Sequence, residues 1–473
     1  MPTWVPYPDF VNPGDNAWQL TAATLVGLMS VPGLAVLYGG VMQKRWSVNS
    51  MMMAFVAFAL VLVVWVLYGF KFAFGSPMHI FGADSGFFSA MWGTPASVLG
   101  TGAEQTQAAI PSITTGPVFN FSQPTLVYFQ LVFAAITPIL MLGSVLGRIN
   151  FRAWIPFVIL WSSIIYTVNA FLIWGGGWWA AHGALDFSGG YVIHLAAGVS
   201  GFVAAAVIGP RLQRDREIDA PNNLLMVATG AGLLWMGWNG FNGGDPYYAG
   251  ADASLAVLNT NVACAVAFLS WVACDYLTGH KPSLISSVNG MITGLVVITP
   301  CAGFVNGWGA LCIGLIGGTI CYFALNYLSR VRPFRNVDDT LGVIYTHGFA
   351  GLAGGLLLGF FADPNIILYP ATGGGATDLP GFAGIFNGGN AELLKDEFVT
   401  ALWVIGFSAI GTFILLKLVG LFVPLRMEES DMEEGDIAVH GHEVYPSDVP
   451  SLGYPAGVPA ATPGATAPAG GTA

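Results

Sequence analysis

The most regular feature of the sequence is a series of long apolar blocks, separated by shorter segments that hold most of its charged residues. Each block has roughly 18 to 24 residues, the length that spans a lipid bilayer as an α-helix. The pattern predicts eleven such helices, over residues 18–40, 50–74, 124–146, 153–174, 190–209, 222–241, 253–276, 284–301, 308–328, 340–361 and 397–421. We therefore expect an all-α polytopic membrane protein with eleven transmembrane helices.

Composition excludes the main alternatives. Of the 473 residues, 55% are apolar and only 9% are charged, and the mean hydropathy is +0.67. Soluble globular proteins carry roughly 25% charged residues. The net charge of −11 is too acidic for nucleic-acid binding. The five cysteines lie in or beside apolar blocks without metal-type spacing, so we expect buried thiols, no structural disulfides and no metal site.

The basic residues predict the orientation of the chain, because Lys and Arg are enriched in cytoplasmic loops. With the N-terminus outside, the predicted inner loops hold Lys44, Arg45, Arg148, Arg152, Arg211, Arg214, Arg216, Lys281, Arg330, Arg332, Arg335 and Arg426. Only Lys71 and Lys395 then lie outside. We expect the N-terminus outside and the C-terminus inside.

The remaining segments divide the chain into predicted regions. Residues 1–17 lack the basic and apolar parts of a secretory signal and are expected to be an extracellular N-terminus. Two transmembrane halves, 18–209 and 222–361, are followed by the eleventh helix at 397–421. Residues 75–123 read as an extracellular loop with little regular structure. Residues 422–473 read as a cytoplasmic tail that begins acidic and is disordered from about 446, where Pro, Ala and Gly dominate.

One pattern occurs in both halves. Residues 186–198 and 339–351 both read D-x-x-G-x-x-x-x-H-x-x-A-G. The first copy belongs to the fifth predicted span and the second to the tenth, so each half holds five helices. An odd number inverts one half relative to the other, an arrangement known from transporters with a substrate path at the repeat interface. We expect a 5+5 inverted repeat plus an eleventh helix.

The repeat places one histidine of each half near the membrane midplane. His194 and His347 lie eight residues beyond Asp186 and Asp339, about 12 Å along a helix. Because the halves are inverted, the two histidines approach the midplane from opposite sides. An ionisable residue there is costly and indicates function. The alternative is a neutral histidine bonded to a neighbouring helix. A neutral pair offers donors and acceptors to a small amine, or can pass a proton.

Several ordered motifs resemble the ammonium transporter family of Amt, Mep and Rhesus proteins, over roughly residues 14–445. They are PGLAVLYGG at 32–40, WGGG at 174–177, HGALDF at 182–187, the stretch 186–211, GWNGFN at 237–242, KPS at 281–283 and TPCAG at 299–303. The resemblance implies eleven helices per subunit, assembled as a homotrimer with one pore in each subunit.

The resemblance also implies roles for aromatic residues. Trp174 and Phe133 match the family's outer recruitment site, where an aromatic cage holds ammonium by cation–π contact. Phe133 and Phe241 match the stacked rings that close the pore at its outer end. Read without the family, Phe133 and Phe241 would be core residues, and Trp174 would be an interface anchor.

His194 and His347 match the family's paired pore histidines, and Asp186 matches a buried carboxylate important for structure and substrate access. The residues alone give Asp186 a second interpretation as the N-cap of its helix. One departure concerns Asp245, which stands where many relatives have a serine that binds the cation. Its carboxylate either strengthens cation attraction, points elsewhere, or caps the turn that follows.

These residues predict an ammonium transporter or channel of the cell membrane. Carrying a bare cation through an apolar pore costs tens of kcal/mol in the low-dielectric limit, whereas neutral ammonia avoids that cost. We expect ammonium to be captured at Trp174, Phe133 and Asp245, to lose its proton, and to cross as ammonia past Phe241, His194 and His347. Whether a proton follows is left open.

Two other functions compete with transport. An ammonium sensor would signal through the cytoplasmic tail, but the tail is short and of low complexity. An intramembrane metalloenzyme would need a third ligand beside the histidines, and the repeat supplies none. We therefore expect no enzymatic activity and no cofactor.

The segment between Arg426 and Tyr445 resembles the family's regulatory C-terminus, which packs on the cytoplasmic face and couples subunits. A trimeric PII-type nitrogen-regulatory protein is a partner to expect there in a prokaryotic host. The alternative is a solvated acidic tail.

Overall fold

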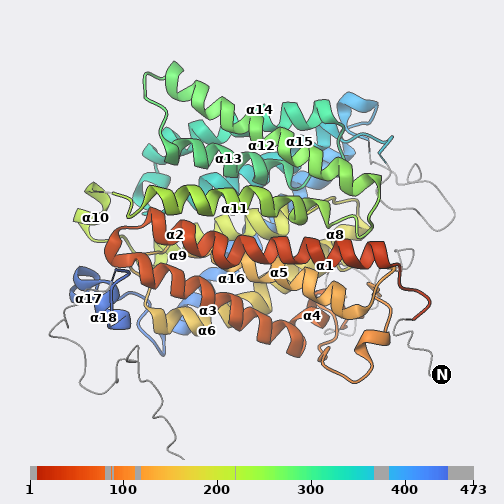
Figure 1. Cartoon of the computed structure of the whole chain (residues 1–473), viewed down its shortest axis with the longest axis horizontal. Helices are drawn as coiled ribbons and strands as arrows, with labels where there is room; N and C mark the ends of the chain where they lie inside the picture. The colour runs from red at the N-terminus through yellow and green to blue at the C-terminus, as the bar shows by residue number, and fades with distance from the viewer. Residues whose placement is uncertain are drawn as a thin grey trace, which may run out of the picture.

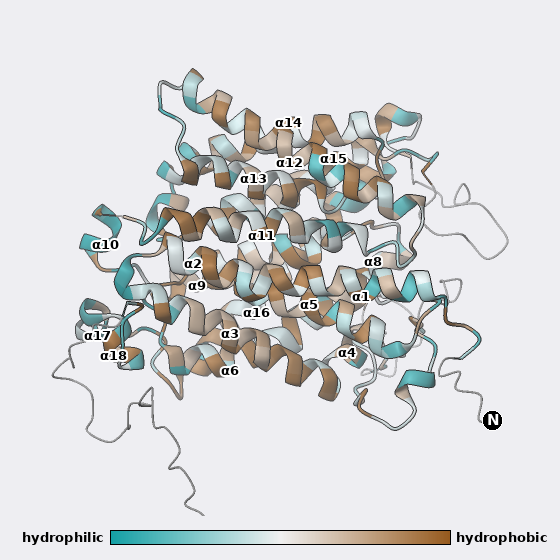
Figure 2. Ribbon diagram, in the orientation of Figure 1, coloured by the Kyte–Doolittle hydropathy of each residue, from teal (hydrophilic) through white to brown (hydrophobic). Residues whose placement is uncertain are grey.

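Apolar helices run side by side through the molecule and are capped by polar loops at both ends (Figures 1 and 2). The computed structural model describes residues 8–79, 87, 90–111, 119–218, 220–366 and 383–445. In this part of the chain, ten helical segments are long and apolar enough to span a membrane, and Leu284–Ile298 is a shorter apolar helix. Together they confirm the eleven predicted helices.

The first half holds five spans, four of which change helix type along their length. They are α1 (Pro13–Leu28), η1 (Met29–Leu34) and α2 (Ala35–Val41); α3 (Ser47–Val64), η3 (Trp65–Gly69) and α4 (Phe70–Phe74); α5 (Gln123–Leu142); α6 (Phe151–Trp161), η6 (Ser162–Tyr166) and α7 (Thr167–Ile173); and η7 (Gly190–Leu195) with α9 (Ala196–Ile208). The first span is interrupted at Val31 (φ −137°), directly before Pro32, because proline cannot continue the helical hydrogen bonds.

The second half repeats this count. Its helices are α11 (Leu224–Gly243), α12 (Ala251–Leu277), α13 (Leu284–Ile298), α14 (Gly307–Asn326) and η10 (Ile344–Phe349) with α15 (Ala350–Phe361), and α16 (Glu392–Gly420) is the eleventh helix. Short helices lie in the loops and tail: η2 (Lys44–Trp46), η5 (Ala103–Gln105), α8 (Trp178–Ala181), α10 (Gln213–Glu217), η8 (Leu328–Arg330), η9 (Phe334–Asn336), η12 (Ile385–Asn387), α17 (Glu429–Glu434) and α18 (Asp436–His440).

The first helix begins at one end of the bundle, and α17 and α18 lie at the other (Figure 1). The first helix and the tail lie at opposite ends because each span carries the chain across the bundle and the number of spans is odd. Following the distribution of basic residues, we call the α1 end outer and the α17–α18 end inner. In the described parts of the predicted loop 75–123, η5 is the longest regular element. Residues 446–473, where the sequence predicts disorder, lie outside the described residues.

The two copies of the repeat have the same local structure. Gly189 and Gly342 occupy equivalent positions with positive φ angles of 107° and 69°, a conformation that glycine adopts readily. Each is followed by a π-helical turn, η7 or η10, that carries the histidine. A Cβ atom on Gly198 would collide with the backbone of Gly348, and one on Gly351 with the carbonyl of Gly190. The fifth and tenth spans therefore cross with their backbones in contact.

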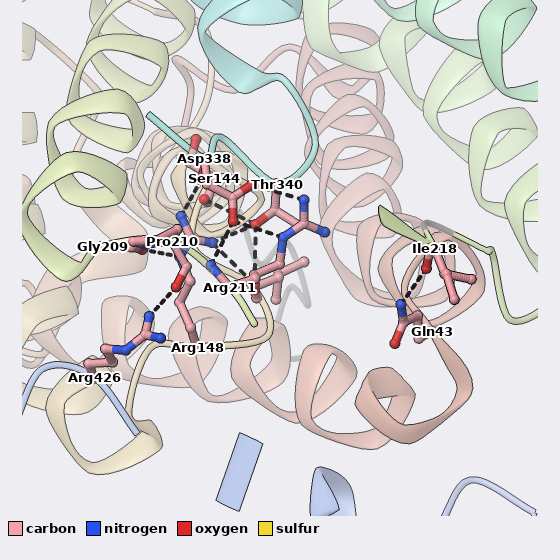
Figure 3. Close-up of polar contacts among 11 residues, drawn as sticks. Gln43, Ser144, Arg148, Gly209, Pro210, Arg211, Ile218, Asp338, Thr340 and Arg426 are labelled. Atoms are coloured by element: carbon pink, nitrogen blue, oxygen red, sulfur yellow. Dashed lines mark hydrogen bonds and ion pairs between the residues drawn. The ribbon is translucent and has the colours of Figure 1, made fainter. Parts of the chain in front are cut away.

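A polar junction joins the two halves at the inner end (Figure 3). The Arg211 guanidinium donates to both carboxylate oxygens of Asp338, at 3.1 and 2.9 Å. The buried Arg148 donates to the carbonyls of Gly209 (2.7 Å) and Asp338. Burial raises the pKa of Asp338, but the hydrogen bonds and charge of Arg211 outweigh it, so the pKa lies below its ordinary value. The ion pair thus holds the loop before η10 against the end of α9.

The tail packs against this inner face. Asp436, at the start of α18, is fully buried, and its carboxylate accepts the backbone N–H groups of Val48 and Asn49, both at 2.8 Å. It thereby caps the N-terminus of α3, where four N–H groups otherwise lack helical partners. His440 Nε2 lies 3.0 Å from the Asn49 side-chain oxygen, and Lys44 pairs with Glu443 at 3.0 Å. The tail is therefore docked through Asp436, His440 and Glu443, whereas the acidic side chains of α17 are exposed.

Removing the capping carboxylate should loosen the tail. We expect Asp436→Ala to speed cleavage of the tail by a glutamyl endopeptidase by about fivefold, because a lost helix cap costs about 1 kcal/mol. The control is Asp431→Ala, since Asp431 is exposed on α17. Equal cleavage of the two variants would contradict the docking role of Asp436.

Docking of the tail should also depend on pH. Burial raises the pKa of Asp436 to about 6, although the backbone hydrogen bonds oppose the shift. The docked tail then binds a proton more tightly than the free tail, so docking weakens as the pH rises through about 6. We expect the protease sensitivity of the wild-type tail to rise between about pH 5 and about pH 7.5. The rise should be smaller in Asp436→Asn, because the amide does not titrate. A wild-type and variant difference that is the same at both values would refute this linkage.

Candidate functional site

Two histidines meet at the crossing of the repeated helices. His194 on η7 and His347 on η10 approach with their Nδ1 atoms 3.2 Å apart and their ring planes at 24°. They are 0% and 7% exposed. The structure therefore brings together the pair that the repeat singles out, one residue from each half of the chain.

The contact between the two Nδ1 atoms constrains the protons of the pair. One ring must donate its Nδ1 proton and the other must accept it, which a pair of neutral imidazoles with different tautomers can do. His194 Nε2 is buried and has no hydrogen-bond partner among the described residues. The pair thus keeps a ring nitrogen that can bond a small polar molecule.

Aromatic rings continue from this pair towards the outer end. The His194 ring stacks on Trp238 at a centroid distance of 5.4 Å, and Trp238 lies 5.0 Å from Phe241. Phe241 stacks on Phe133 at 4.3 Å and 25°. Trp174 stands edge-on to Phe133 at 6.2 Å and 80°. The predicted site residues Trp174, Phe133 and Phe241 therefore form one continuous series with His194.

Asp186 holds both ends of this series. Its backbone carbonyl accepts the indole N–H of Trp174 at 2.6 Å. Its carboxylate accepts the backbone N–H groups of Gly189, Tyr191 and Val192 at 2.9 to 3.1 Å, at the start of the helix that carries His194. The helix begins at Gly190, so Asp186 caps it from the preceding loop and not from the N-cap position that the sequence suggested.

Asp245 follows the end of α11 and is only 4% exposed. Its carboxyl contacts the hydroxyl of Ser188, which also lies 2.8 Å from the backbone carbonyl of Phe241. Among the described residues, the Ser188 hydroxyl is the one hydrogen-bond partner of the Asp245 carboxyl. Asp245 therefore does not cap the backbone of the turn at Pro246. Asp245 instead lies beside the loop that orients Trp174.

A cavity of about 370 Å³ approaches the histidines from the inner end. Its wall includes inner-loop residues such as Arg335 and Asp338, and reaches Trp238 and His347. The histidine pair therefore separates a tightly packed series of rings on the outer side from an open space on the inner side.

Sequence reasoning missed three residues of this region. Trp238 lies within the GWNGFN motif, three positions before Phe241. Ser188 occupies a variable position of the repeat. Glu397 on α16 is fully buried and accepts the backbone N–H of Leu185 at 2.7 Å, which ties the eleventh helix to the loop before Asp186. An acidic residue at the start of an apolar block was the available signal for Glu397.

A metalloenzyme would need at least three converging ligands. In the region that the structure covers, no group of three or more His, Cys, Asp or Glu side chains could hold a metal ion. All five cysteines lie in this region and are free thiols.

Residues 17–445 match the family model described as Ammonium Transporter Family. The chain is 47% identical to ammonium transporter 3 member 2 of Oryza sativa subsp. japonica, over 92% of this chain and 90% of the relative. It is 46% identical to ammonium transporter 2 of Arabidopsis thaliana, over 93% and 89%.

Solved structures have the same fold. Mep2 of Saccharomyces cerevisiae superposes with a TM-score of 0.73 at 28% identity, over 89% of each chain. Mep2 of Candida albicans superposes with a TM-score of 0.74 at 27% identity, over 89% of this chain and 88% of that one. The fold, the match over 17–445 and the similarity to curated relatives lead to one conclusion: this chain belongs to the ammonium transporter family.

Proposed function

We propose that the protein conducts ammonium nitrogen across a cell membrane as ammonia. The observation that supports this most is the series of contacts from the ring of Trp174 to the pair His194 and His347, with the inner cavity on the other side of the pair. The curated relatives named as ammonium transporters support the choice of substrate. Trp174 and Phe133, with Asp245 nearby, would recruit the cation by cation–π and charge attraction.

The stacked rings of Phe133 and Phe241 form the outer gate of the proposed path. Their centroid distance of 4.3 Å leaves no space between the rings, so they must move apart for a molecule to pass. Neither ring offers a hydrogen bond to replace the water that a cation would lose. The gate therefore favours ammonia, because a bare cation would pay its full desolvation cost.

The histidine pair provides polar contacts inside this apolar path. Ammonia can donate to the free ring nitrogen of one imidazole or accept from an N–H group of the other. The hydrogen bond between His194 and His347 also offers a route for a proton. A proton that followed it would make transport electrogenic, and one that stayed outside would make it electroneutral.

Three copies of the chain are proposed to assemble as a trimer. Trp235 and Asn239 on α11 and Asn261 on α12 form a half-buried hydrogen-bond network, with contacts of 2.9 and 2.7 Å. Lipid cannot hydrogen-bond such groups, so a neighbouring protein surface would stabilise them. The docked tail at the inner end is the proposed contact for a PII-type regulator where the host has one.

Replacing His194 by Ala should change uptake in reconstituted vesicles. We expect slower alkalinisation of the interior after an ammonium step, weaker selectivity against potassium, or both, because the variant removes the polar contacts at the midplane. His280→Ala, at an exposed position of the inner end, is the control. Unchanged rate and selectivity would remove the pair from the mechanism. Wild-type vesicles that show neither ammonium-dependent alkalinisation nor current would refute the proposed transport itself.

Replacing Trp174 by Leu should weaken recruitment. Loss of one cation–π contact of about 0.5 to 2 kcal/mol predicts a half-saturating ammonium concentration roughly 2- to 30-fold higher. The matched control is Trp308→Leu, since the Trp308 side chain is exposed at the start of α14. An equal effect of the two substitutions would argue that Trp174 acts as an interface anchor.

A further inference from the structure

The hydroxyl of Ser188 lies between two oxygen atoms. It contacts the carboxyl of Asp245 and, at 2.8 Å, the backbone carbonyl of Phe241. A serine hydroxyl has one proton, and a carbonyl oxygen has none to give. Both contacts are hydrogen bonds only if the Asp245 carboxyl carries a proton and donates to Ser188. The geometry therefore fits the neutral acid.

The surroundings of Asp245 favour the same form. No Lys, Arg or His side chain pairs with Asp245 among the residues that the structure describes, and the titratable groups that interact with it electrostatically are Asp186 and the Tyr166 hydroxyl. A buried carboxylate without a cationic partner is costly. Asp186 differs, because three backbone N–H groups solvate its carboxylate. The two neighbouring acids are thus suited to different states.

We infer that Asp245 is the group that takes the proton from ammonium, on the outer side of the Phe133 and Phe241 gate. This inference rests on the proposed function and names the acceptor that it requires. Asp245 is well placed because it shares Ser188 with the backbone of Phe241, and because the loop that holds Ser188 also holds Trp174 through Asp186.

The proton balance closes within one cycle. An approaching ammonium displaces the resting proton of Asp245 to the outer solution and pairs with the carboxylate. An N–H bond of ammonium then breaks and an O–H bond forms on Asp245, while the electron pair of the N–H bond stays on nitrogen. Burial favours this step, because it converts an ion pair into two neutral groups. Ammonia passes the gate, and the acid is back in its resting state.

Asp245→Asn tests this role, since the amide can donate to Ser188 as the acid does but cannot accept a proton. We expect the maximal rate of ammonium-dependent alkalinisation to fall by at least about 100-fold, the lower end of the range for loss of a general base. Asp252→Asn, in the first turn of α12 at the same end, is the control. A wild-type maximal rate in Asp245→Asn, with or without a raised half-saturating concentration, would overturn the inference. Inactive wild-type vesicles would instead refute the proposed function.

A measurement on the resting protein keeps the inference testable if Asp245→Asn fails to fold. The infrared spectrum at neutral pH should contain the carbonyl band of a protonated carboxylic acid, and that band should shift in Ser188→Ala, which removes the acceptor of its hydrogen bond. The band should also be lost in Asp245→Asn where that variant folds. A spectrum with no such band in the wild type, or with a band that Ser188→Ala leaves unmoved, would overturn the inference.

Discussion

The crossing of the fifth and tenth spans is the constraint on which the rest of the structure depends. A buried ionisable side chain at this depth needs a polar partner, and the 3.2 Å contact between His194 and His347 requires the helices that carry them to touch. Glycine allows this at Gly198 and Gly351, where a Cβ atom would meet the backbone of the other helix. The outer rings and the inner cavity are then the two sides of this single contact.

The same capping arrangement fixes the start of both helices, at opposite ends of the molecule. Asp186 and Asp339 accept backbone N–H groups at the start of η7 and η10, and a glycine with positive φ follows each by three residues. Their further attachments differ. On the outer side Asp186 also holds Trp174, whereas on the inner side the neighbouring Asp338 binds Arg211 and Arg148. The two copies of the inverted repeat thus serve different ends of the molecule: the outer copy holds a residue of the proposed recruitment site, and the inner copy forms the junction beneath the tail.

The sequence predicted those features that depend on local composition or on the repeat. Span positions follow from runs of apolar residues, and the convergence of His194 and His347 follows from two equal spacings in an inverted frame. The junction of Arg148 with Asp338 could not be predicted, because its partners lie 190 positions apart and no periodicity links them. The same holds for Asp436. The resemblance to the family's C-terminus led us to expect a tail packed on the cytoplasmic face, but nothing in the sequence indicated that this carboxylate caps a helix almost 390 positions away.

The chemistry of the proposed path explains how it could distinguish ammonium from potassium without a size filter. Both are monovalent cations of similar size, and both would be drawn to the rings of Trp174 and Phe133. Beyond Phe241 the path offers aromatic faces and neutral imidazoles, which cannot repay the desolvation of a charge. Only ammonium can leave its charge behind as a proton. Selectivity would then follow from an acid–base reaction before the gate, and a tightly packed apolar gate would be a requirement of the mechanism rather than an obstacle to it.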